Sequence, residues 1–116
     1  MNSPKLPADL LEVLASMDDV TALERLLGDL LTYNEVESLQ ERWEIVKLLA
    51  AGHSQRTIRD ALGVSVTTVS RGSKQLKYGE GGFALAFDAL SALGHGDPRH
   101  PAPTGPNAGD AHKEAL

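Results

Sequence analysis

The chain has 116 residues, which is enough for one small domain with a modest core and too few for two domains. Its 16 acidic and 11 basic side chains give it a net charge of −5. The absence of cysteine excludes disulfides and thiolate chemistry, and no apolar run reaches the ~18–20 residues that cross a bilayer, so we expect a cytoplasmic protein without a membrane contact.

Helical periodicity predicts an all-α fold of about six helices per chain, because no segment alternates apolar and polar residues as a strand does. A flexible arm over residues 1–6 precedes the first two predicted helices, which cover residues 7–17 and 20–31. A third, longer helix follows. Asn34 and Glu37 have the spacing of a capping pair at its start.

Residues 54–77 predict two short helices joined by a glycine-marked turn. Ser54 and Ser65 are suitable N-caps, and Gly63 can close the first helix in the left-handed conformation. Five basic residues and one acidic residue give the segment a net charge of +4, so the rest of the chain carries −9. A cationic segment on an acidic protein indicates a polyanionic partner. The pattern therefore predicts a helix-turn-helix that binds double-stranded DNA; the alternative from another class is a helical module that docks on an acidic protein.

The last predicted helix covers residues 83–93 and completes a core over residues 7–93. From Gly94 the composition changes to proline, glycine and polar residues, which predicts a disordered tail over residues 94–116. The helices before the helix-turn-helix carry more leucine than so small a domain buries alone, so we expect a homodimer. A two-fold dimer would present two helix-turn-helix units to a symmetric operator.

Catalytic and metal chemistry are not indicated. No nucleophile, base and orienting group can be assigned as a set. His95, His100 and His112 lack the spacing of metal ligands. Trp43 lies at helical spacing from apolar neighbours and is expected in the core rather than in a stacking site. The sequence therefore predicts a binding protein rather than an enzyme.

Residues 30–77 read LLTYNEVESLQERWEIVKLLAAGHSQRTIRDALGVSVTTVSRGSKQLK. The leucine–threonine pair, the arginine inside the third helix, the SQR that opens the helix-turn-helix and the RGS of its second helix resemble the bacterial tryptophan operon repressor family. The likeness covers roughly residues 10–93, and LKYGEGGFALAFDAL is more similar to repressor-like relatives of unassigned ligand. The resemblance implies an intertwined helical homodimer that represses amino-acid biosynthesis genes, with L-tryptophan as co-repressor.

The resemblance also implies an effector site between the core and the helix-turn-helix. Carried over position by position, the arginines that sandwich the indole fall on Arg42 and Arg71, and the glycine that admits it falls on Gly72. Arginine planes stack on an indole and pair with a carboxylate, which agrees with this role. The remaining positions fall on Leu31 and Thr32, contributed across the dimer, and on Gln75.

Two positions depart from the family and leave the effector open. Gln75 replaces a small serine and Asp29 replaces a leucine, so another indole-like or aromatic effector, or none, is the alternative to tryptophan. Without an effector, Arg42 is interpreted as a solvent-facing helix arginine and Arg71 as a phosphate clamp.

The contacts to DNA are expected from one set of polar and basic residues. The guanidinium of Arg56 matches the two acceptors of guanine, whereas Arg59 and the lysines suit phosphates. All of these residues except Lys74 fall on positions that contact DNA in the family. Lys74 is added because of its positive charge. The set is Ser54, Gln55, Arg56, Arg59, Val66, Thr67, Thr68, Ser70, Lys74 and Lys77.

Overall fold

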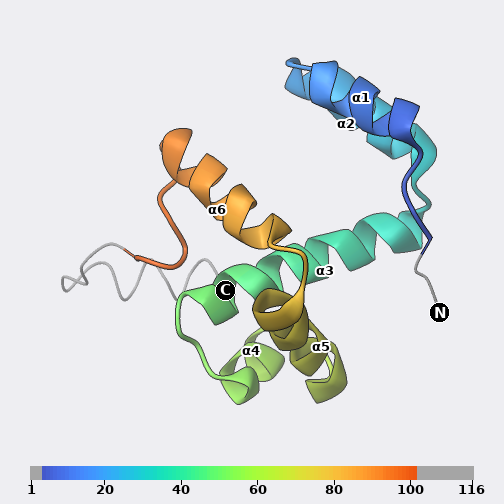
Figure 1. Ribbon diagram of the computed structural model, residues 1–116. Coiled ribbons are helices and arrows are strands. Elements are labelled where there is room, and N and C mark those ends of the chain that lie inside the picture. Colours follow the sequence, from blue (N-terminus) through green and yellow to red (C-terminus); the bar gives the residue numbers. More distant parts are fainter. Residues whose placement is uncertain (1–3, 102–116) are drawn as a thin grey trace. The chain divides into compact units, whose positions relative to one another are not determined.

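The computed structural model describes residues 4–101, and its regular structure is six helices joined by short connections (Figure 1). Because residues 4–101 contain no strand, the predicted all-α fold class is confirmed. The chain divides into an N-terminal and a C-terminal compact unit between Leu39 and Gln40, inside the third helix. The helices are α1 (Ala8–Ser16), α2 (Val20–Leu30), α3 (Tyr33–Ala50), α4 (Gln55–Leu62), α5 (Val66–Tyr78) and α6 (Gly82–Ala92).

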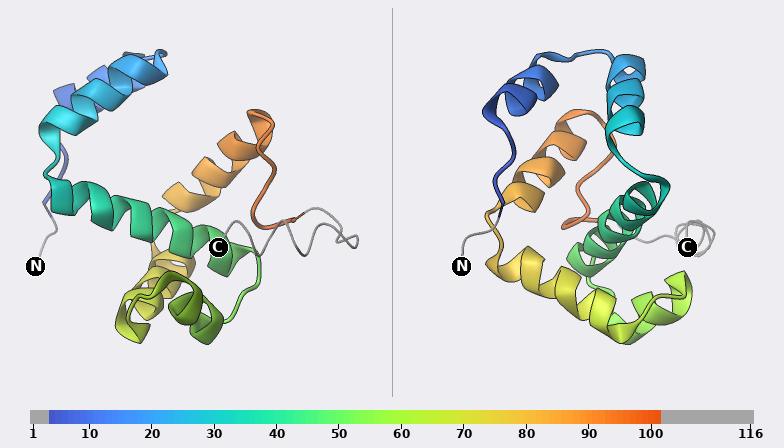
Figure 2. Two further views of the ribbon diagram at one scale, coloured as in Figure 1. Left: turned by 180° about the vertical axis from the view of Figure 1, so that it is seen from behind. Right: turned by 90° about the vertical axis from the view of Figure 1, so that its right-hand side faces the viewer.

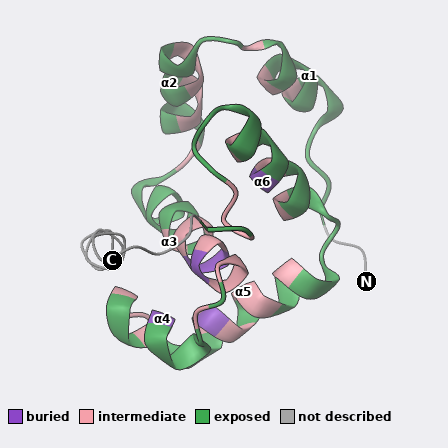
Figure 3. Cartoon of the chain, turned by 90° about the vertical axis from the view of Figure 1, so that its left-hand side faces the viewer, coloured by how far each residue is buried: buried purple, intermediate pink, exposed green. Residues whose placement is uncertain are grey.

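The N-terminal unit holds α1, α2 and the first turns of α3. Asp19 caps α2 by accepting a hydrogen bond from the Thr21 N–H at 3.1 Å. Neither α1 nor α2 has a buried residue, although both are rich in leucine (Figure 3). Side chains as large as Val20, Leu30 and Leu11 stay exposed. One copy of the chain therefore leaves the apolar faces of these helices open to water.

The start of α3 differs from the prediction. The Thr32 N–H donates to Glu35 Oε1 at 2.8 Å, and the Glu35 N–H donates to Thr32 Oγ1 at 3.2 Å, which is a reciprocal capping box. The expected cap at Asn34 is wrong, because Asn34 already lies inside the helix. Both pairs have the same spacing, but the box at Thr32 starts the helix earlier. Its backbone hydrogen bond lowers the pKa of Glu35.

The core of the C-terminal unit joins α4 and α5 to the second half of α3. Ile45 and Leu48 of α3 pack with Ile58 of α4 and Val69 of α5, and all four are buried. In the views of Figures 1 and 2, α6 lies on the other side of α3 from α4 and α5. Apolar side chains thus fix the α4–turn–α5 unit to α3.

On the side of α3 that faces α6, an aromatic contact forms the interface. The ring of the fully buried Phe87 lies 6.1 Å from that of Trp43, centroid to centroid. Trp43 is half-buried, as a residue at the edge of a core is. None of the helices within residues 4–101 is long and apolar enough to span a membrane.

The end of the described structure also differs from the expectation. Residues 94–101, which composition assigned to a disordered tail, form turns, and the Arg99 side chain bonds to α6. The reason is a long-range ion pair between Arg99 and Asp88, which composition does not reveal. The rest of the expected tail, residues 102–116, lies outside the described residues, as do residues 1–3 of the expected arm.

Candidate nucleic-acid interface and effector site

The reading head, defined here as residues Ser54–Lys77, is built by two serine caps and one glycine. Ser54 Oγ accepts from the Thr57 N–H at 3.1 Å at the start of α4. Ser65 does the same at the start of α5. Gly63 between them has φ +67°, a left-handed conformation that costs a glycine little, and its N–H donates to the Arg59 carbonyl at 2.9 Å. The predicted caps and turn are confirmed.

The head carries its charge on exposed side chains. Arg56, Lys74 and Lys77 are exposed, and spacings of three residues place Arg56 with Arg59 and Lys74 with Lys77 on shared helix faces. The buried Ile58 lies between the two arginines in sequence and points into the core, so the arginines flank the packed face.

One of these cations already has a partner. Arg59 Nε donates to Asp60 Oδ1 at 2.8 Å, and this hydrogen bond lowers the pKa of Asp60 and raises that of Arg59. Asp60 is the single acidic residue of the head. Because the pair is exposed, it reduces the positive potential near Arg59 without removing the charge from solvent.

The predicted DNA-contacting residues divide by what their side chains already do. Ser54 and Thr68 are engaged in the caps, since Ser54 Oγ lies 2.9 Å from Thr57 Oγ1 and Thr68 Oγ1 lies 2.8 Å from Ser65 Oγ. Ser70 is half-buried. Exposed positions are Gln55, Arg56, Val66, Thr67, Lys74 and Lys77.

Thr57 is a residue of this site that the sequence interpretation missed. It uses its N–H and its hydroxyl to complete the first cap, as Thr68 does in the second. The signal was present as a repeated spacing, Ser54-x-x-Thr57 and Ser65-x-x-Thr68. The same local structure therefore begins both helices of the head.

Of the effector positions in the C-terminal unit, Gly72 lies where α5 crosses α3. A Cβ placed on Gly72 would lie 2.8 Å from Ile45 Cγ2 and 3.7 Å from Leu49 Cδ1. Arg42 is one helical turn before Ile45, and Arg71 directly precedes Gly72. Both arginines are exposed and, among residues 4–101, neither forms an ion pair.

The remaining effector positions are placed as follows. Gln75 is exposed on α5, one turn after Arg71. Leu31 and Thr32 belong to the N-terminal unit, and the Thr32 hydroxyl takes part in the capping box. Asp29 is exposed near the end of α2. Within residues 4–101, no group of His, Asp and Glu is arranged to hold a metal ion.

The profile of the Trp repressor protein family matches residues 7–91, from α1 to the last turn of α6. The chain belongs to the Trp repressor family. A Trp operon repressor homolog of Vibrio parahaemolyticus is 42% identical over 69 residues, which are 59% of this chain and 67% of that one. The uncharacterized protein YerC of Bacillus subtilis is 33% identical over 75 residues, or 65% and 72% of the two chains. No solved structure matches the chain significantly.

Membership of the Trp repressor family makes this chain a member of a group of DNA-binding transcription regulators rather than of enzymes. The match includes the whole reading head, with α4, the turn at Gly63 and α5. It ends before residues 94–101.

Proposed function

We propose that the chain is a sequence-specific transcriptional repressor that binds a two-fold symmetric DNA operator as a homodimer, with L-tryptophan as co-repressor and amino-acid biosynthesis genes as targets. The observation that carries this proposal is the reading head. A net charge of +4 is concentrated on two capped helices of a chain whose total charge is −5. Such a local field attracts the phosphate backbone although the protein is acidic.

Base contacts are assigned to the exposed side chains at the start of each helix of the head. Arg56 follows the Ser54 cap of α4, and Val66 and Thr67 follow the Ser65 cap of α5. A guanidinium reads guanine bidentately, and Val66 and Thr67 offer methyl groups to thymine. Arg59, Lys74 and Lys77 then neutralise phosphates.

The open apolar faces of the N-terminal unit support the homodimer. Helices α1 and α2 bury none of their residues in one chain, and Val20 and Leu30 are 82% and 50% exposed. Because exposed leucine and valine faces of this extent are unfavourable in water, a second copy is the partner that a symmetric assembly supplies. Light scattering should find a dimer in solution.

The effector assignment rests on Arg42 and Arg71, which come from two helices that touch at Ile45 and Gly72. Their guanidinium groups have no acidic partner among the described residues, so they are available to stack on an aromatic ring. Asp29 and Gln75 favour the alternative of another indole-like or aromatic effector, or of none, on the same fold.

The DNA part of the proposal is tested by selecting binding sites from genomic fragments and measuring affinity over a salt series. Arg56→Ala should cost about 1–3 kcal/mol at the selected site and much less on random DNA, since it removes a base contact. Arg59→Ala should weaken binding to all sequences and flatten the salt slope. Equal losses on selected and random DNA in Arg56→Ala would contradict base reading. Absence of any salt-sensitive DNA binding would favour docking on an acidic protein.

The effector part is tested by repeating the titrations with L-tryptophan, indole-related compounds and L-phenylalanine. Tryptophan should tighten operator binding and raise the melting temperature of the protein, because a ligand that binds the folded state stabilises it. Arg42→Ala should lose this response and keep the salt slope of the unliganded protein. If another indole compound tightens operator binding and tryptophan does not, that compound is the co-repressor, and the assignment as a repressor stands.

A further inference from the structure

The segment after α6 forms a C-terminal strap, defined here as residues Gly94–Pro101. It leaves the helix at Gly94, and the His95 N–H donates back to the Leu90 carbonyl at 2.9 Å. The strap lies beyond the part of the chain that the Trp repressor profile matches. Its contacts with α6 are therefore a feature of this chain that the family match does not explain.

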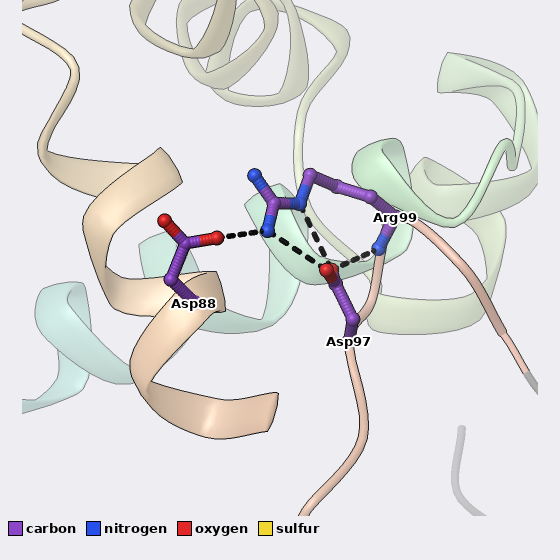
Figure 4. A network of polar contacts seen from close by, with 3 residues as sticks. All are labelled: Asp88, Asp97 and Arg99. Atoms are coloured by element: carbon purple, nitrogen blue, oxygen red, sulfur yellow. Dashed lines mark hydrogen bonds and ion pairs between the residues drawn. The ribbon is translucent and has the colours of Figure 1, made fainter. Parts of the chain in front are cut away.

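A single arginine ties the strap to α6 (Figure 4). Arg99 Nη2 donates to Asp88 Oδ1 of α6 at 2.5 Å and to Asp97 Oδ2 of the strap at 2.8 Å. Arg99 Nε and the Arg99 backbone N–H both donate to Asp97 Oδ1 at 2.9 Å. Asp97 thus orients the guanidinium, and Asp88 accepts its hydrogen bond from α6.

The same guanidinium lies over an aromatic cluster between α3 and α6. Its central carbon is 5.7 Å from the centroid of the Phe87 ring, which is completely buried. Phe83 and Trp43 lie 6.4 Å and 6.1 Å from that ring. The positively charged guanidinium of Arg99 therefore makes a cation–π contact with Phe87 at the interface between α6 and α3.

These polar contacts hold the strap beside an open pocket. A cavity of about 480 Å³ lies against it, lined by Lys47 of α3, Leu90 of α6 and strap residues that include His95 and His100. Arg99 keeps 34% of its side chain exposed and Asp88 keeps 67%. Because both side chains stay partly exposed, the ion pair that ties the strap to α6 is accessible to salt and protons.

We propose that the strap is an electrostatic latch, closed when Arg99 bridges Asp97 and Asp88 over Phe87, that holds the strap on α6 and opens as a unit while the reading head stays folded. This device is independent of DNA and effector binding. Opening removes the Arg99 guanidinium from the Phe87 ring and exposes that ring to water. The core formed by Ile45, Ile58 and Val69 lies with α4 and α5 and does not depend on Arg99.

The single tryptophan of the chain, Trp43, reports on the latch through acrylamide quenching of its fluorescence. Hydrogen exchange followed by mass spectrometry reports on the strap amides separately. In full-length Arg99→Ala, quenching of Trp43 and exchange over residues 94–101 should rise several-fold, whereas exchange over α4 and α5 stays as in the unmodified chain. Lys5→Ala, which removes an exposed cation of the N-terminal unit, should change neither readout.

Further variants decide whether the ion pair is the cause. Arg99→Lys keeps the charge but not the fork of donors, so it should be intermediate. Asp88→Asn should raise strap exchange when it is made in the unmodified chain. It should raise strap exchange little further when it is made in Arg99→Ala, because both substitutions remove the same ion pair. Unchanged strap exchange in Arg99→Ala, or full additivity of the two substitutions, would overturn the latch.

A salt series keeps the test decisive if Arg99→Ala unfolds the whole chain. Raising the ionic strength from about 0.1 M to about 1 M shortens the Debye length from about 10 Å to about 3 Å. Strap exchange in the unmodified protein should then increase, and the increase should be smaller in Asp88→Asn. If the hydrogen-exchange rate of the strap amides does not change with ionic strength in either protein, the electrostatic latch is refuted.

Discussion

Replacing Gly72 by alanine separates two reasons for a glycine at the crossing of α3 and α5. The family resemblance assigns Gly72 to the admission of an indole, whereas the structure places a Cβ at this position 2.8 Å from Ile45 Cγ2. Ile45 is 1% exposed, so its γ2 methyl has no solvent to move into. If close helix packing requires the glycine, Gly72→Ala should lose the stability that alanine normally adds to a helix, even when no effector is present.

The magnitude follows from two opposing effects. Carbon atoms pack at about 3.5–4.0 Å, so about 0.7 Å or more of overlap has to be relieved by shifting α5 or Ile45. Overpacking of this kind costs about 1–3 kcal/mol. Alanine is favoured over glycine in a helix interior by about 1 kcal/mol. The net change is a loss of about 0–2 kcal/mol in the free energy of unfolding, measured by urea denaturation at fixed protein concentration.

A double-mutant cycle with Ile45 isolates the overlap. Ile45→Ala removes the γ2 methyl, so Gly72→Ala should stabilise that background by about 1 kcal/mol. Ile45→Val keeps the methyl and is the matched control, in which Gly72→Ala should cost as much as in the unmodified chain. Since Ile45→Ala itself costs about 2–5 kcal/mol, the cycle is measured in a stabilising osmolyte. The packing argument is refuted if Gly72→Ala stabilises all three backgrounds equally.

Three further predictions concern the reading head and the strap. Asp60→Asn removes the partner of Arg59 and raises the net charge of the head from +4 to +5, so it should tighten binding to any DNA and steepen the salt dependence measured by fluorescence anisotropy. Ser65→Ala removes the cap of α5 and should cost about 1 kcal/mol of unfolding free energy in urea melts. The hydrogen bond from Arg99 holds the pKa of Asp97 at about 2, below its usual 3.8, so the latch should be fully closed above about pH 5 and open as the pH falls through 4 toward 2, observed by quenching of Trp43.

Matched variants control these three experiments. Glu24→Gln makes the same charge change in α2, and an equal gain in DNA affinity there would contradict a local effect of Asp60. Ser65→Asp keeps a capping oxygen and should retain stability; a loss as large as that of Ser65→Ala would argue against the cap.

The acid transition of the latch has its own controls. Lys47, His95 and His100 line the pocket beside Asp97 and are the cationic or titratable side chains that face it besides Arg99. Asp88 is the other carboxylate on Arg99, and Asp88→Asn separates its share of the transition. A transition that persists unchanged in Arg99→Ala would exclude Asp97 as its origin.

Much of the local structure of this protein follows from patterns among residues that are close in sequence. Helical periodicity predicted six helices, and Ser54, Gly63 and Ser65 predicted the ends of α4 and α5, because caps and left-handed turns depend on atoms only a few residues apart. Charge counting located the reading head for a similar reason, since the sum over a segment does not depend on the fold.

Tertiary structure decided what depends on contact between distant residues. The contact of Gly72 with Ile45 requires two helices to cross at that point. The strap is ordered because Arg99 reaches Asp88, eleven residues away, and turns a stretch whose composition indicates disorder into a bonded segment. Such contacts follow from distances in three dimensions, which no short window of sequence contains.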